Sequence, residues 1–191
     1  MNEELLQKAM QLFDTAEKWN SFCELMGRKD DMQKRWWKKL QTEVYQREQK
    51  NGICDWDIFI ENQWDIRWFI KGETRNTICV HFWADRFRVF YNYGDLDKDK
   101  VFELLKDPKF DIIKSCIDRI EGSDNETICW EERNFAFGTS YDNCFPDRQT
   151  LSWYAGNETE KFADQLIAKV RKFQTPEITA LFKEINEKCR K

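Results

Sequence analysis

The chain has 191 residues, of which 41% are hydrophobic, 15% aromatic and 35% charged, and its net charge is −4. This hydrophobic content excludes a generally disordered chain, and the net charge is too small to indicate either an acidic mimic of nucleic acid or a general affinity for DNA. A length near 200 residues suits one domain, so we expect residues 1–191 to share a single core.

The sequence shows no export signal and no membrane segment. The opening stretch, MNEELLQKAM, carries acidic residues where a signal peptide needs basic ones. No apolar run approaches the roughly 18 residues that span a bilayer. We therefore expect a cytoplasmic protein that does not enter a membrane.

Cysteine and histidine usage gives no indication of a metal or a cofactor. The seven cysteines are widely spaced and contain no CxxC pair, which argues against a disulfide framework and against a zinc site. The single histidine, His81, excludes a histidine-rich metal site and is the one base that a Ser-His-Asp arrangement could use. We expect free thiols, no metal and no cofactor.

The first fifty residues show the apolar spacing of helices. Apolar side chains recur at three- and four-residue steps from Leu5 to Met26, and Gly27 interrupts the pattern. A second apolar stripe follows over residues 32–44. Two helices, or one kinked helix, are predicted over residues 1–50.

Four alternating runs come next, and each is typical of a strand with one buried face. Their connections are too short for crossover helices, so an antiparallel meander is predicted. The runs lie near residues 55–61, 64–71, 77–83 and 86–93.

After the meander, helical and strand-like patterns alternate. Asp97 and Asp107-Pro108 are typical helix starts, so residues 98–120 are predicted to hold a short helix followed by a longer one. The stretches TICWEERNFAF (127–137) and QTLSWYA (149–155) are predicted as two further strands.

Two amphipathic helices close the chain. Asn157 with Glu160 is a capping arrangement for the first, and Thr175-Pro176 begins the second. The order of elements predicts an α+β fold in which an antiparallel sheet, a four-strand meander plus two further strands, has helices packed on one face. The expected parts are a helical N-terminal segment 1–50, a sheet core 53–155 and C-terminal helices at 158–190.

The apolar alternation also predicts how the strands pair. A slip by one residue would turn every buried side chain to the wrong face, so apolar residues must oppose one another. Pairing Trp56 with Trp68, Trp68 with Val80 and Val80 with Val89 leaves one polar row across four strands on the opposite face. That row consists of Asp57, Arg67, His81 and Arg88.

These four residues, Asp57, Arg67, His81 and Arg88, form the candidate anion- or partner-binding site. Arginine offers forked donors to a carboxylate or phosphate, and two guanidiniums beside an imidazole disfavour its protonation. The alternative is structural, because Asp57 and Arg67 can form an ordinary cross-strand pair and a covering helix can supply other acids.

A metal-dependent nuclease is the competing interpretation. Such an enzyme places an Asp on one strand and an acid-x-Lys on the next to hold magnesium, and Asp57 followed by Asp65-Ile66-Arg67 imitates that spacing. In the predicted register, however, Asp65 lies beside Phe59 rather than Asp57, and Arg67 is too basic to accept a proton. We therefore assign no catalytic residues.

Two other stretches have compositions that are typical of functional segments. KRWWKK (34–39) could track a nucleic-acid backbone, but on a helix Trp36 and Trp37 join the packed stripe and the basic residues stand on a solvated outer face. FGTSYDNCFPDR (137–148) is the longest irregular stretch and carries Cys144 without an adjacent base.

Several stretches together resemble a domain of unknown function found in restriction-endonuclease-related bacterial proteins. They are RWWKKL, TICVHFWADRFRVFYNY, KVFELLKDPKFDIIKSCIDRI and ICWEERN, with a closing amphipathic helix. The resemblance covers residues 30–185, and the Trp-Glu pair of those domains is matched by Trp130-Glu131. It implies a genome-defence or DNA-associated setting and carries over no catalytic residue.

Without an assembled catalytic constellation, the sequence favours a non-catalytic binding or accessory module. Its expected partner is a protein or an anionic ligand, recognised through the polar face of the sheet. A nucleic-acid-binding or nuclease-like accessory domain is the alternative.

Overall fold

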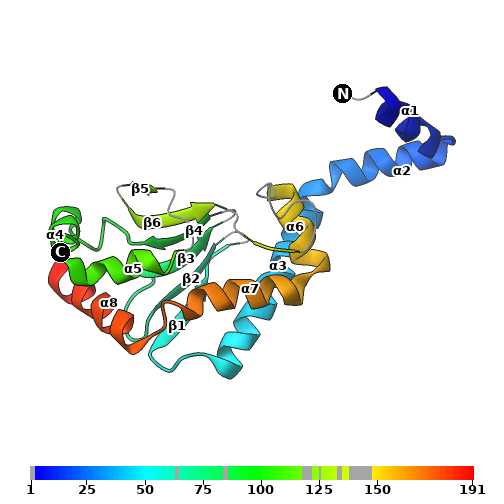
Figure 1. Cartoon of the computed structure of the whole chain (residues 1–191). Coiled ribbons are helices and arrows are strands. Elements are labelled where there is room, and N and C mark those ends of the chain that lie inside the picture. Colours follow the sequence, from blue (N-terminus) through cyan, green and yellow to red (C-terminus); the bar gives the residue numbers. More distant parts are fainter. Residues whose placement is uncertain are drawn as a thin grey trace.

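Eight α-helices surround an open antiparallel sheet in the part of the chain that the structure describes (Figure 1). The structure is a computed structural model, and it describes residues 3–62, 65–83, 86–117, 122–124, 126–132, 135–137 and 148–191. The predicted α+β class is confirmed, with the sheet antiparallel and the helices on one of its faces.

The N-terminal segment forms three helices, one more than predicted: α1 (Glu3–Leu12), α2 (Ala16–Gly27) and α3 (Lys29–Asn51). The additional break follows from Thr15, whose Oγ1 accepts a hydrogen bond from the backbone N–H of Lys18 at 3.2 Å and so begins α2. Figure 1 shows α1 and α2 extending away from the rest of the molecule, with α1 at the far end. We call residues 3–27 the arm.

The sheet contains the predicted meander and two further strands. Its described strands lie in the order β1-β2-β3-β4-β6-β5, and every neighbouring pair is antiparallel. They are β1 (Trp56–Ile60), β2 (Asp65–Ile70), β3 (Cys79–Trp83), β4 (Arg86–Phe90), β5 (Gly122–Asp124) and β6 (Thr127–Glu132).

One face of the sheet forms the core together with the helices. Trp56, Ile66 and Trp68 belong to the same buried cluster as side chains from α3, α7 and α8. The smaller cluster on the opposite face, Phe69, Cys79 and Phe90 with Phe59 against it, contains strand residues alone. Among the described residues, therefore, helices cover one face and not the other.

The region after the meander holds less helix than predicted. Helix α4 (Lys98–Leu104) is the short helix expected after Asp97, whose side chain caps it. The second helix begins as a 3-10 turn, η1 (Pro108–Phe110), and continues as α5 (Asp111–Ser115), so within the described residues it is one residue longer than α4 and ends before the predicted residue 120. Residues 118–121 lie outside the described part.

The strand predicted over 149–155 is wrong, because these residues belong to helix α6 (Arg148–Asn157), which lies inside the predicted sheet core 53–155. Leu151, Tyr154 and Ala155 are buried at helical spacing, whereas Trp153, which an alternating strand would have buried, is 47% exposed. Figure 1 shows α6 beside α3 at the base of the arm.

The last two helices occupy the predicted range, and their starts test two capping predictions. Helix α7 (Thr159–Arg171) has no side-chain cap, and the Asn157 side chain instead donates to the carbonyl of Trp153, so the predicted capping arrangement is wrong. Helix α8 (Pro176–Cys189) begins as predicted, with Thr175 Oγ1 accepting from the N–H of Ile178 at 3.2 Å.

One ion pair lies inside the layer between sheet and helices. Lys169 of α7 donates from Nζ to Oε1 of Glu131 on β6, and Glu131 is 1% exposed. Such a pair compensates two charges that would otherwise be buried at high cost. In the described part of the chain, no helix has both the length and the apolar character needed to cross a bilayer.

Candidate functional site: the polar face of the sheet

Strand pairing brings three of the four predicted site residues together. Arg67 on β2 lies opposite His81 on β3, and His81 lies opposite Arg88 on β4, as the apolar alternation predicted. All three are on the face opposite Trp68 and Val80, because side chains alternate along a strand. The predicted row is therefore real over β2, β3 and β4.

The fourth residue, Asp57, does not join the row, so its predicted pairing with Arg67 is wrong. Asp57 lies opposite Phe69 and is exposed, and Phe59 is the residue opposite Arg67. The pairing of β1 with β2 differs from the predicted one by two residues. Such a slip keeps every apolar side chain on the same face, so the alternation alone could not exclude it.

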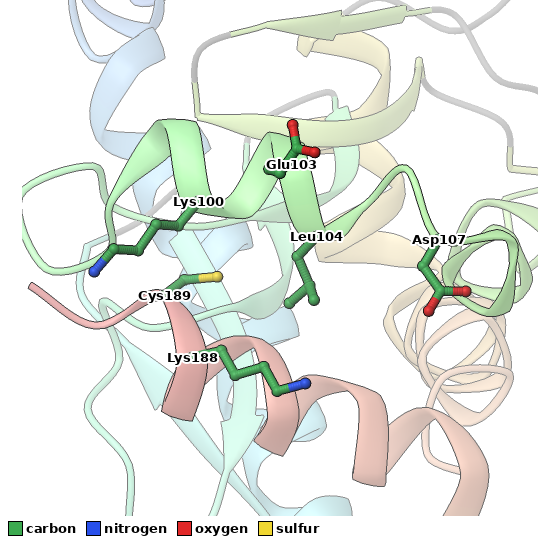
Figure 2. Close-up of a pocket in the computed structure, with 6 residues that line it drawn as sticks. All are labelled: Lys100, Glu103, Leu104, Asp107, Lys188 and Cys189. Carbon is green, nitrogen blue, oxygen red and sulfur yellow. The ribbon is translucent and has the colours of Figure 1, made fainter.

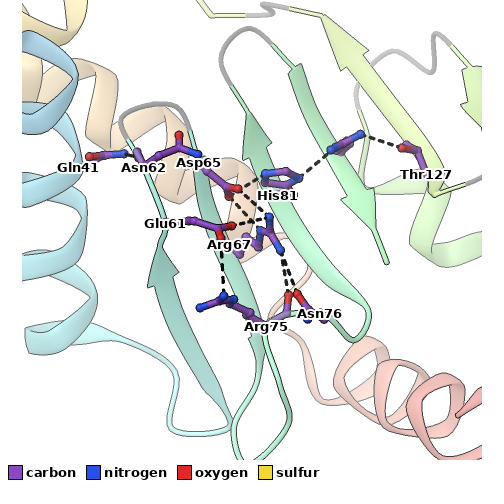
Figure 3. Close-up of polar contacts among 10 residues, drawn as sticks. Gln41, Glu61, Asn62, Asp65, Arg67, Arg75, Asn76, His81 and Thr127 are labelled. Carbon is purple, nitrogen blue, oxygen red and sulfur yellow. Dashed lines mark hydrogen bonds and ion pairs between the residues drawn. The ribbon is translucent and has the colours of Figure 1, made fainter. Parts of the chain in front are cut away.

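Asp65 supplies the carboxylate that Asp57 was expected to provide. Its Oδ1 accepts from Nε of Arg67 at 3.0 Å and its Oδ2 accepts from Nη2 at 2.7 Å, a two-point contact between the carboxylate and the guanidinium (Figure 3). Glu61 adds a second acid, since its Oε2 lies 3.1 Å from Nη2 of the same guanidinium and its Oε1 lies 3.6 Å from Nη2 of Arg75. Arg67 is thus neutralised within the sheet.

His81 connects this acidic end of the row to Arg88. Its Nδ1 accepts from Nε of Arg88 at 3.1 Å, and therefore Nε2 carries the proton of the neutral ring. Oδ1 of Asp65 lies 2.9 Å from Nε2, so the carboxylate is close enough to accept from the protonated side of the ring. Arg88 continues the chain by donating from Nη1 to Oγ1 of Thr127 at 3.1 Å (Figure 3).

Burial and neighbouring charges fix the protonation states of this group. Burial, together with the nearby cations Arg88 and Arg67, lowers the pKa of His81 to about 4 despite the opposing effect of Asp65. Burial alone would raise the pKa of Asp65, but its contacts with His81 and Arg67 hold that pKa well below the usual range. At neutral pH, His81 is therefore neutral and Asp65 is ionised.

Aromatic rings lie among the arginines of this face. The guanidinium carbons of Arg75 and Arg86 lie 4.3 Å and 4.5 Å from the ring centres of Phe59 and Trp130. Arg88 lies 4.5 Å from the ring centre of Phe90 and 5.6 Å from that of Trp83. Stacking of this kind holds a guanidinium flat against a ring while its N–H edge still faces outward.

Four of these residues lie at the end of the sheet where β3 and β4 connect, and we call them the Arg–Trp patch: Trp83, Arg86, Arg88 and Trp130. Trp83 is directly opposite Arg86, and Arg88 is directly opposite Trp130. Trp83 is 41% exposed, and Arg86 and Trp130 are partly exposed. The patch is thus accessible, whereas His81 is 2% exposed.

Cys79 and His81 do not form a nucleophile–base pair. Cys79, two residues before His81 on the same strand face, is fully buried, and burial raises its pKa to about 12, so it stays a thiol. His81 cannot act as a base toward it, because the ring nitrogen that lacks a proton already accepts from Arg88. Among the described residues of this face, these two side chains therefore do not make an activated nucleophile.

The two carboxylates that the nuclease interpretation requires, Asp57 and Asp65, do not lie together. Asp57 and Asp65 are at opposite ends of their strand pair, since Ile60 pairs with Ile66 next to Asp65 while Asp57 pairs with Phe69. Among the described residues, no group of three or more Asp, Glu, His or Cys side chains is placed to hold a metal ion.

Of the two other candidate stretches, the first contributes to packing and the second lies mostly outside the described residues. In KRWWKK, Trp37 is 1% exposed and donates to Oγ of Ser152 at 2.7 Å, so it cannot stack on a nucleic-acid base. Within the stretch 137–148, residues 138–147, including Cys144, lie outside the described residues.

Figure 2 shows a different pocket, of about 360 Å³, between α4 and the end of α8. Its polar lining mixes Lys100 and Lys188 with Glu103 and Asp107, so the charges oppose one another. Cys189 is 1% exposed and burial raises its pKa, which makes it an unreactive thiol. The mixed charges and the unreactive thiol of this pocket therefore do not make it a better candidate site than the sheet face.

Sequence reasoning missed the two acids and the aromatic side chains of the site. Asp65 is two residues before Arg67, so the alternation already placed both on one face, and that spacing was the available signal. Phe90 and Trp83 follow the same rule on the neighbouring strands. Their importance depended on the stacking geometry, which alternation does not reveal.

Comparison with known proteins found no matching family model, no matching curated protein and no matching solved structure. The resemblance to a domain in restriction-endonuclease-related proteins therefore stays a prediction.

Proposed function

We propose that this protein is a non-catalytic binding module that recognises an anionic group of a macromolecular partner through the Arg–Trp patch. The observation that carries this proposal is the stacking of Arg86 on Trp130 and of Arg88 near Trp83 on a face that no described helix covers. Arginine and tryptophan are the residue types that contribute most to binding free energy in protein interfaces.

The buried part of the row supports the patch and does not itself bind the partner. Arg67 is paired with Asp65 and Glu61, so it has no charge left to offer a second anion. His81 holds Nε of Arg88 from the side, which fixes the orientation of that guanidinium. In this proposal Arg88 and His81 position the patch, and Arg86 with the two tryptophans makes the contact.

The partner presents an isolated anionic group, a carboxylate or a phosphate, and not a long polyanion. The net charge of −4 would repel a nucleic-acid backbone at long range, and the patch holds only two arginines. The six described cysteines, which are all free, suit a reducing compartment, and we place the protein in the cytoplasm on that ground.

Thermal unfolding in phosphate and in chloride at equal ionic strength tests this function. A ligand at ten times its Kd stabilises the folded state by about 1.4 kcal/mol, which raises the Tm of a chain of this size by about 3–6 °C. Arg86→Gln should remove the difference between phosphate and chloride, because it deletes one guanidinium without touching the buried row.

Arg28→Gln is the matched control, since Arg28 is an exposed arginine remote from the sheet, and this variant should respond as the wild type does. The proposal is wrong if phosphate gives no advantage over chloride, or if Arg86→Gln keeps the full advantage. A short single-stranded oligonucleotide should leave the tryptophan fluorescence unchanged; quenching that Arg86→Gln abolishes would instead identify nucleic acid as the partner.

A further inference from the structure

The arm exposes large apolar side chains that nothing in the described structure covers. Helix α2 contains no buried residue, and no described residue of α1 is buried. A helix pair of this length gains little stability in water without packing its apolar side against another surface. The arm side chains with large exposed fractions are Leu6, Met10, Leu12, Trp19, Leu25 and Met26, at 41–68%.

The corner between α1 and α2 is packed by three aromatic rings. The rings of Phe13, Trp19 and Phe22 lie with their centres 4.5–5.9 Å apart and hold the two helices at an angle. The corner therefore has a defined shape, which makes the arm a preformed surface.

An apolar groove of about 410 Å³ lies at the base of the arm. It runs between α2, α3 and α6, beginning at Phe22 and ending at Trp153, which is 47% exposed. Phe22, Leu25 and Met26 of the arm thus share this groove with side chains of the body of the protein. The groove is lined by Phe22, Leu25, Met26, Lys29, Met32, Gln33, Trp36, Gln149 and Trp153.

The two ends of this surface carry opposite charge. Residues 3–17 at the tip contain four acidic residues and one basic residue, a balance of −3. Residues 28–39 at the base contain six basic residues and two acidic ones, a balance of +4. Two exposed pairs reach across the ends of these ranges, Lys18 with Asp14 and Arg28 with Glu24, and counting Lys18 and Glu24 leaves −2 at the tip and +3 at the base.

We propose that the occupant of this surface is a second copy of the same chain, with the two arms lying antiparallel about a two-fold axis. In that arrangement the acidic tip of each arm meets the basic base of the other, and the apolar side of α1 lies on the partner's groove. The surface is self-complementary in the way that a two-fold interface requires. Helix α2 is about 18 Å long and separates the acidic tip from the basic base. In the antiparallel arrangement, each tip can therefore reach the base of the other arm.

The exposed side chains are sufficient for a stable dimer. A standard interface buries about 800 Å² on each partner and places tryptophan and other large side chains near its centre. Arm and groove together present eight large apolar side chains that are each 38–68% exposed, an area of that order. The eight are Leu6, Met10, Leu12, Trp19, Leu25, Met26, Met32 and Trp153.

Sedimentation velocity of the full chain at about 1 to 100 μM should show a species of twice the 23.3 kDa chain mass. Met10→Glu with Met26→Glu should give a monomer, because both side chains are more than half exposed on the arm. Tyr93→Glu is the matched control, since Tyr93 is 57% exposed outside the arm, and it should leave the dimer intact. Equal circular dichroism spectra and thermal melting of the body show that the variants fold.

Charge reversal tests the antiparallel arrangement itself. Glu3→Lys with Glu4→Lys changes the balance of residues 3–17 from −3 to +1, and Lys29→Glu with Lys34→Glu and Arg35→Glu changes that of residues 28–39 from +4 to −2. Either set alone should weaken the dimer at least tenfold. All five changes in one chain should restore it, since tip and base are again opposite in charge. A monomeric wild type overturns the proposal, and so does a five-fold variant that stays as weak as the two partial variants.

Discussion

Acidification from about pH 7.5 to about pH 5 should destabilise this protein through His81. The folded protein holds the pKa of His81 at about 4, whereas an unfolded chain has a histidine pKa of about 6.5. The unfolded state therefore binds a proton at a higher pH than the folded state does. The stabilisation is fully present above about pH 6.5 and is lost progressively as the pH falls toward about 4.

The size of the effect follows from the difference between the two pKa values. It amounts to a loss of about 2 kcal/mol at pH 5, and of about 3 kcal/mol near pH 4, in the free energy of unfolding. Below that, protonation of Asp65 removes further stability, because its pKa is also lowered in the folded state. Glu48 acts in the opposite direction, since burial raises its pKa.

Urea unfolding of the wild type and of His81→Gln across this pH range isolates the contribution of the histidine. Glutamine can still accept from Arg88 and donate to Asp65, and the contribution of Glu48 is common to both proteins. The chain has one histidine, so its imidazole proton resonances report a single pKa without assignment. Titration of the folded protein near pH 6.5, or equal losses of stability in both proteins, would refute the reasoning.

Two further variants test the packing around the site. A Cβ at Gly156 would overlap Cδ1 of Trp36, so Gly156→Ala should lower the free energy of unfolding, measured with urea, by about 1–3 kcal/mol. Gly27→Ala should leave it unchanged, because a Cβ there meets nothing within 4 Å. Lys169→Met should cost about 3–5 kcal/mol because it leaves the Glu131 carboxylate buried without its ion-pair partner, and adding Glu131→Gln should recover most of that loss. Thermal melting that shows Lys169→Met as stable as the wild type would contradict this account of the pair.

The sequence predicted elements and faces better than it predicted contacts. The four strands of the meander and the Arg67–His81–Arg88 row follow from alternation, because a side chain on the wrong face would bury a charge. The pairing of β1 with β2 does not follow, since Trp56 can oppose either Trp68 or Ile70 with the same faces buried. The length of the connection after Ile60 decides between them, and alternation contains no information about it.

Helix α6 shows the corresponding limit for short segments. Leu151, Trp153 and Ala155 alternate as in a strand, while Leu151, Tyr154 and Ala155 have the spacing of a helix, and seven residues satisfy both patterns. The tertiary packing of Trp37 and Trp36 of α3 against this segment decides the outcome. The candidate site was limited in the same way, because Asp65 could be assigned to the polar face but not to a contact with His81.

The order of the strands has a consequence for colloidal behaviour. An open sheet ends in two strands whose outer backbone groups can pair with another chain and so nucleate aggregation. At one end lies β5, which is described over Gly122–Asp124. At the other end β1 is longer and lacks a described neighbour on its outer side, but it carries the exposed carboxylate of Asp57 at its second position. A second strand that paired with β1 would have to desolvate this carboxylate. Asp57 therefore disfavours edge-to-edge association.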